Sequence, residues 1–192
     1  QKGHMKLNEY IHYDGLGLAQ LIEKKEVQPI ELLELALQRS DQVNPKLNAI
    51  IIPMHEYAKN RAKQQLTGAF AGVPFLVKDL FQEYAGIPTS YGCNALKSRQ
   101  YTPETNAEIV NRWEKAGIIT FGRTNTPEFG IKGITEPDAW GSCSNPWHLK
   151  HNSGGSSGGS ASAVAAGIVP IAGAGDGGGS VSYTHLRAHE TR

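Results

Sequence analysis

Serines stand among closely spaced glycines near the end of this chain, where a hydroxyl group could act as a nucleophile. Residues 151–180 contain 10 Gly and 6 Ser. Within them, Gly155-Ser-Ser157-Gly-Gly159 fits the pattern G-x-S-x-G, in which a serine projects from a sharp turn between a strand and a helix. That turn needs an apolar strand directly before it, and the polar residues 147–153 do not supply one. None of the seven histidines is placed to act as its base, so this hypothesis is not favoured.

Two other kinds of site are conceivable in the same region. Gly173-Ala-Gly175-Asp-Gly-Gly178 fits the dinucleotide pattern G-x-G-x-x-G, which also needs a following helix and an acidic residue about 20 positions on. The chain ends at residue 192, before that acidic residue could occur. Cys143, His148 and His151 could bind a metal, but a structural zinc site needs four ligands and no fourth stands at a standard spacing. The sequence therefore predicts no metal and no cofactor.

A flexible linker is the simplest interpretation of a Gly/Ser tract. It fails on the apolar residues inside the tract, which are Val164, Ala165, Ala166, Ile168, Val169 and Ile171. They favour a folded segment instead: a glycine loop, a helix over about 158–166 that Gly167 ends, a strand over 168–172, and a second glycine loop.

The elements before this region divide into a helical part and an alternating part. Residues 15–67 are predicted to be helical, with one helix capped by Asp14, a second that begins at Pro29 and ends at Asn44-Pro45, and a third over about 54–66. An apolar run over 73–77 then predicts a buried strand, directly followed by Lys78.

Further along, Thr105 and Glu108 have the spacing of a capping box, which predicts a helix that ends at Gly117. A strand over 118–121 and a short helix near 126–128 follow. Strands that alternate with helices predict an α/β fold with a mixed sheet flanked by helices, behind an N-terminal helical segment.

The composition excludes several classes of protein. The chain has 192 residues, 39% of them hydrophobic, and a formal net charge of +1. Such a chain can form a core, but it lacks the basic patch expected of a protein that binds nucleic acid or an anionic membrane. No apolar run reaches the roughly 20 residues that span a bilayer. Only two cysteines and no export signal are present, so we expect a cytoplasmic location.

Several motifs occur together in one order along the chain. These motifs are Gly72-Val-Pro-Phe-Leu-Val-Lys78-Asp79, Gly122-Arg-Thr-Asn-Thr-Pro-Glu-Phe129, Asn145-Pro146, Gly154-Gly-Ser-Ser-Gly-Gly-Ser160 and Asp176-Gly-Gly-Gly-Ser180. With them the chain resembles the amidase signature family from about residue 14 to 180. The resemblance implies the α/β fold of that family and the hydrolysis of a carboxylic amide by a Ser–cis-Ser–Lys triad, without a cofactor.

The resemblance also implies a role for each matching residue. Ser180 matches the nucleophile, Ser156 the bridging cis-serine and Lys78 the general base, while Gly177, Gly178 and Gly179 match the oxyanion hole. Ser157 and Asp176 are expected to support the site, whereas Asn125 and Glu128 either support it or belong to a capped short helix. The expected partner is a small-molecule amide, and a homodimer is possible for the full-length protein.

These roles agree with the chemistry of the residue types. A serine hydroxyl must lose its proton as it attacks, so it needs a base nearby. A lysine can accept that proton only when neutral, and burial disfavours the ammonium form, although Asp79 would oppose this if it points inward. Backbone N–H groups that stabilise the developing oxyanion need the close approach that glycine permits.

The match ends at Ser180. The family continues with Ile-Arg, whereas Val181 follows here, so residues 181–192 are predicted to be a foreign tail on a truncated chain of an N-terminal extension (1–13) and part of an amidase domain (14–180). We therefore expect the fragment to be inactive. Two alternatives stay open: the glutaminase subunit of a tRNA-dependent amidotransferase, and a non-catalytic remnant.

Overall fold

A three-stranded sheet lies at the centre of the computed structural model, which describes residues 4–181. The strands are β1 (Ile50–Pro53), β2 (Pro74–Lys78) and β3 (Ile119–Thr124), in the order β1-β3-β2. β1 runs antiparallel to β3, and β2 runs parallel to it. Every residue of β2 and β3 is buried. The predicted α/β class with a mixed sheet is confirmed.

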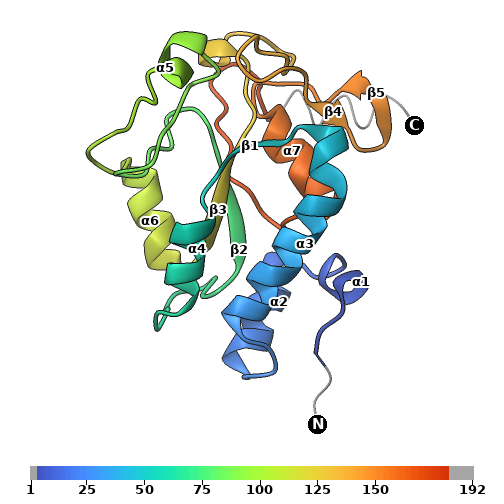
Figure 1. The fold of residues 1–192 in the computed structure, drawn as a ribbon. Helices are drawn as coiled ribbons and strands as arrows, with labels where there is room; N and C mark the ends of the chain where they lie inside the picture. The colour runs from blue at the N-terminus through green and yellow to red at the C-terminus, as the bar shows by residue number, and fades with distance from the viewer. Residues whose placement is uncertain (1–3, 182–192) are drawn as a thin grey trace.

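Helices cover both faces of this sheet (Figure 1). The covering helices are α1 (Leu7–Tyr10), α2 (Gly15–Glu23), α3 (Pro29–Leu47), α4 (His55–Ala62), α6 (Glu108–Ala116) and α7 (Gly158–Ala165). Helix α5 (Asn94–Ser98) and the 3₁₀ helix η1 (Glu128–Gly130) bury no residue of their own. Strands β4 (Ser144–Asn145) and β5 (His148–Asn152) form a separate antiparallel hairpin before α7. None of the described helices combines the length and apolarity needed to cross a bilayer.

Successive side chains of β2 belong to two different apolar clusters. Phe75 and Val77 pack with Val110 of α6, whereas Leu76 packs with residues of α2, α3 and α7. Side chains of a strand point alternately to its two faces, so Lys78 shares the face of Leu76, on which α7 lies.

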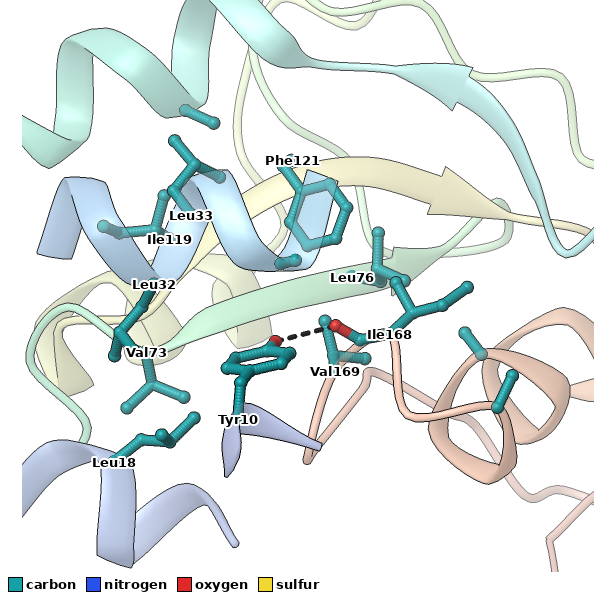
Figure 2. Close-up of a cluster of buried hydrophobic side chains, with 14 of the residues drawn as sticks. Tyr10, Leu18, Leu32, Leu33, Val73, Leu76, Ile119, Phe121, Ile168 and Val169 are labelled. Carbon is teal, nitrogen blue, oxygen red and sulfur yellow. Dashed lines mark hydrogen bonds between the residues drawn. The ribbon is translucent and has the colours of Figure 1, made fainter. Parts of the chain in front are cut away.

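The larger cluster includes residues from both ends of the described chain, as Figure 2 shows. Tyr10 is buried there, and its hydroxyl donates a hydrogen bond to the Ile168 carbonyl oxygen at 2.7 Å. Residues 4–13, expected only as an extension, thus contribute to the core beside the segment that follows α7.

Several predicted elements are confirmed. Asp14 caps α2 by accepting a hydrogen bond from Gly17 N at 2.6 Å, and Pro29 occupies the first turn of α3. Gly117 ends α6 in the left-handed region at φ 89°. The helix expected over 158–166 is α7.

Two expectations about the helical region are wrong. Helix α3 continues through Pro45 to Leu47, because a proline in the last turn removes only one backbone hydrogen bond. The Asn44 side chain accepts hydrogen bonds from Ala49 N and Ile50 N, both at 2.9 Å, and so directs the chain into β1. The β-branched residues of β1 lay inside the region predicted to be helical.

Two expectations further along are also wrong. Helix α6 begins at Glu108 with Ala107 as its N-cap, so Thr105 does not form a capping box. Residues 168–172 are buried or half-buried but form no strand, since Pro170 cannot donate to a ladder. One backbone bond at their end, from Gly173 N to Leu76 O at 2.7 Å, holds the segment against β2.

Candidate active site

Lys78 is the last residue of β2, and its side chain is 2% exposed. Because every residue of β2 is buried, the amine of a lysine at the end of this strand is buried too. The face that it shares with Leu76 is the one beneath the start of α7, so the amine meets the glycine-rich turn that leads into that helix.

The turn before α7 contains the two adjacent serines Ser156 and Ser157. The Gly155–Ser156 peptide bond is cis, as the resemblance implied. Helix α7 then starts close to other backbone: a Cβ on Gly159 would lie 2.3 Å from Asn125 N. Only glycine fits there, because real Cβ atoms do not approach a heavy atom so closely.

The chain reaches Ser180 through the second glycine loop. Gly173 N donates to Leu76 O, and Gly173 O accepts a 2.6 Å hydrogen bond from Ser160 Oγ of α7. The loop is therefore attached to both β2 and α7 before it turns to place Ser180, which is 9% exposed.

The three serine side chains that these elements contribute all lie within hydrogen-bonding distance of the Lys78 amine. Lys78 Nζ is 2.7 Å from Ser156 Oγ, 3.0 Å from Ser157 Oγ and 3.4 Å from Ser180 Oγ. Ser180 Oγ is 3.1 Å from Ser156 Oγ and 2.7 Å from Ser157 Oγ, and it accepts a hydrogen bond from Ser157 N at 2.8 Å. The structure thus brings together the three residues matched to the triad, with Ser157 just as near.

Burial lowers the pKa of Lys78 from its usual 10.5 to about 8, and the negative charge of Asp176 opposes this shift. The sequence pointed to Asp79 as the possible opposing charge. Asp79 instead accepts hydrogen bonds from Thr89 Oγ1 at 2.7 Å and from the Ser90 N–H and hydroxyl. An amine with this pKa is partly neutral near pH 7 and can accept a proton.

The buried amine has a consequence for stability. Because the pKa of Lys78 is lower in the folded than in the unfolded chain, folding disfavours the ammonium fully below about pH 8, and this penalty disappears as the pH rises toward 10.5. The free energy of unfolding of Lys78→Met, relative to that of the parent chain, should therefore be highest near pH 7 and should fall by up to about 3 kcal/mol as the pH rises to 10.5. Urea unfolding of both chains from pH 7 to 10.5 measures this. Parallel stability curves would contradict it.

Asp176 also binds the backbone of its own loop. Its carboxylate accepts hydrogen bonds from Gly179 N at 2.6 Å and Val181 N at 3.0 Å. Gly177 and Gly178 are exposed, and Gly179 has φ 100°. The Gly179 N–H thus points at Asp176 here, and the oxyanion-hole role of Gly177, Gly178 and Gly179 stays a prediction.

Asn125 and Glu128 lie outside the cluster around Lys78. Asn125 is buried, and its Nδ2 donates to Asn48 O and Gly141 O, both at 3.1 Å, so it joins segments of the fold and does not cap η1. Glu128 is exposed. Thr126, which the sequence did not single out, donates from its hydroxyl to Ser156 O at 2.9 Å and so holds the turn of the cis peptide.

The residues considered as metal ligands lie in or beside the β4–β5 hairpin. The rings of His148 and His151 stack with centroids 4.1 Å apart, while Cys143 is buried. Within residues 4–181, no group of three His, Cys, Asp or Glu side chains could hold a metal ion.

Known proteins resemble this chain in both sequence and structure. A sequence profile of the family described as Amidase matches residues 31–183. The 6-aminohexanoate-cyclic-dimer hydrolase of Paenarthrobacter ureafaciens is 42% identical over 168 residues, which are 88% of this chain and 34% of that relative. A solved structure of 6-aminohexanoate cyclic dimer hydrolase complexed with substrate superposes with a TM-score of 0.87 at 40% identity, over 91% of this chain and 36% of that one.

A relative with another activity is also similar. A glutamyl-tRNA(Gln) amidotransferase subunit of Halothermothrix orenii is 39% identical over 164 residues, which are 85% of this chain and 34% of that relative. The chain therefore spans about a third of the length of each of these relatives. The tail predicted to be foreign lies, apart from Val181, outside the described residues.

Proposed function

The chain belongs to the amidase signature family, and from that premise we propose that it contains the Ser–cis-Ser–Lys apparatus of an enzyme that hydrolyses carboxylic amides. The observation that supports this most is the cluster in which Lys78 Nζ, Ser156 Oγ and Ser180 Oγ are joined by distances of 2.7 and 3.1 Å. No histidine is needed in such a relay, because the lysine amine is itself the base.

In the proposed reaction, the Ser180 oxygen attacks the amide carbonyl carbon and its proton passes to Ser156. Ser156 gives its own proton to the neutral amine of Lys78. The amide C–N bond then breaks as this proton returns through Ser156 to the leaving amine, which leaves an acyl-enzyme ester on Ser180. Water next attacks the ester, its proton passes to Lys78 through Ser156, and a proton returns to the Ser180 oxygen as the ester C–O bond breaks. Ser157 supports the nucleophile, since its N–H donates to Ser180 Oγ at 2.8 Å.

The N–H groups of Gly177, Gly178 and Gly179 are proposed to stabilise the tetrahedral oxyanion. For Gly179 this requires that its hydrogen bond to Asp176 be exchanged for one to the substrate oxygen. Asp176 has a second proposed effect: its charge keeps the pKa of Lys78 from falling further than burial alone would take it.

The substrate is proposed to be a small linear or cyclic amide, and the relative that is 42% identical is a 6-aminohexanoate-cyclic-dimer hydrolase. The glutaminase component of a tRNA-dependent amidotransferase is the second candidate, since the amidotransferase relative is 39% identical. A cytoplasmic location fits two free cysteines, Cys93 and Cys143. Because the chain spans only about a third of the length of these relatives, the 192-residue chain alone is proposed to be inactive.

A chimera with a longer relative tests the proposed triad without the missing length of the relatives as a second variable. Residues 5–180 would replace the matching segment of the Paenarthrobacter hydrolase, and hydrolysis of 6-aminohexanoate cyclic dimer would be followed. We expect turnover by the chimera, retention of that turnover after the double replacement His148→Ala and His151→Ala, and none by the 192-residue chain. A requirement for either histidine would restore a serine–histidine mechanism, and robust turnover by the chain alone would overturn its proposed inactivity.

A further inference from the structure

Gln82 lies in the segment that follows β2, and its side chain is turned back toward the strand. The residue is 5% exposed. Its Oε1 accepts a hydrogen bond from Lys78 N at 2.7 Å, and its Nε2 donates to Ala174 O at 3.1 Å. A single side-chain amide therefore bonds to the backbone of the lysine strand and to the backbone of the loop that leads to Ser180.

This amide occupies the place where direct backbone pairing between the two segments stops. Gly173 N still donates directly to Leu76 O at 2.7 Å. Two residues further along β2, the Lys78 N–H bonds to the Gln82 amide instead, and Gly173 O bonds to Ser160 Oγ. The side chains thus extend the attachment of the loop past the point where its backbone leaves the strand.

The fit around the amide is close. A Cβ on Gly173 would lie 2.4 Å from Gln82 Oε1 and 2.9 Å from the Trp113 ring, so a side chain at position 173 would push the Gln82 amide away from Lys78 N. The backbone of Gln82 is also held, because its main-chain carbonyl oxygen accepts a hydrogen bond from the fully buried Arg123 guanidinium at 2.9 Å. The side-chain amide thus extends from an anchored backbone to its two partners, Lys78 N and Ala174 O.

The two bonds also require an amide. Lys78 N is a donor and needs an oxygen, whereas Ala174 O is an acceptor and needs an N–H, and glutamine supplies both. A glutamate of the same size would keep the first bond but would bring a second oxygen against Ala174 O.

We infer that Gln82 is a positioning residue, whose side-chain amide fixes the distance between the lysine base and the loop that holds the serine nucleophile. This inference rests on the proposed function, in which Lys78 is the base and Ser180 the nucleophile. The two hydrogen bonds of the Gln82 amide can nevertheless be measured without turnover. A relay of hydroxyl and amine groups depends on such fixed distances, since a displacement of about 1 Å can lower a rate about 100-fold.

Three variants of the 192-residue chain separate the two bonds. Gln82→Met keeps the approximate size and removes both bonds, Gln82→Glu keeps only the acceptor, and Gln65→Glu makes the same charge change at an exposed position. Nuclear magnetic resonance would report amide hydrogen exchange at Lys78, the carbonyl ¹³C shift of Ala174 and the titration of the Lys78 side chain.

We expect Gln82→Met to accelerate exchange at Lys78 about tenfold and to shift the Ala174 carbonyl signal, because each reports one lost hydrogen bond. Gln82→Glu should leave amide exchange at Lys78 unchanged and should shift the Ala174 carbonyl signal. It should also move the titration of the Lys78 side chain to higher pH, since a new negative charge favours the ammonium. Gln65→Glu should change none of the three.

An unchanged Lys78 exchange rate and Ala174 shift in Gln82→Met would overturn the inference. So would Gln82→Glu behaving like Gln82→Met, because loss of packing alone does not distinguish the two bonds. Failure of the chimera to hydrolyse amides would refute the proposed function and would leave this pattern of signals intact.

Discussion

Replacement of Ser180 by alanine is expected to lower amide hydrolysis by the chimera about 10⁴-fold or more, with substrate binding largely kept. The reason is that no acyl-enzyme can form without the Ser180 oxygen, and loss of a serine nucleophile has effects of about this size in other hydrolases. The measurement is kcat and KM for 6-aminohexanoate cyclic dimer, beside a binding assay for the same compound.

Ser153→Ala is the matched control, because it removes a hydroxyl directly before the first glycine loop and outside the cluster around Lys78. Its kcat should stay within a few-fold of the parent chimera. A Ser180→Ala chimera that retains more than a hundredth of the parent rate would show that another group attacks the amide, and the two serines 2.7–3.1 Å away would be the first to test.

Replacement of Lys78 by alanine is the second large effect. We expect kcat/KM to fall about 10³- to 10⁴-fold, near the upper end of what a general base contributes, because Ser156 then has no acceptor for its proton. The parent chimera should gain activity as the pH rises through about 8, where Lys78 becomes neutral, and this rise should be absent from whatever activity Lys78→Ala retains.

The variant Lys78→Arg provides a control for the charge, since a guanidinium cannot lose its proton in this pH range. Lys78→Arg should be as inactive as Lys78→Ala. Substantial activity in Lys78→Arg would mean that position 78 acts through its positive charge and not as a base.

The residues that meet around Lys78 could be found from the sequence because they stand in short, ordered motifs. Lys78 follows an apolar run, Ser156 and Ser180 stand in two glycine loops, and the resemblance of these motifs to the amidase signature family implied a role for each residue. The central strands β2 and β3 and helix α7 were predicted for the same reason: their apolar runs and glycine boundaries are local signals.

What the sequence did not show depends on contacts between distant segments. Nothing near Gln82 indicates that its amide would reach Ala174, 92 positions away. Nor does the sequence indicate that the Ser157 hydroxyl would lie as near to Ser180 Oγ as the Ser156 hydroxyl does. The strand expected over 168–172 was wrong for a local reason as well: Pro170 lacks the N–H that a ladder needs, and only the bond from Gly173 N to Leu76 O holds the end of the segment against β2.

The most direct test of the central claim, that Ser180 is a nucleophile activated by Lys78 through Ser156, is to identify the acylated residue. The chimera would be quenched during turnover of an ester analogue of the substrate and digested, and the peptides would be analysed by mass spectrometry. The account predicts an acyl group on Ser180, greatly diminished in Lys78→Ala and in Ser156→Ala. An acyl group on any other residue, or turnover without an acylated Ser180 under conditions that trap it in the parent hydrolase, would contradict the account.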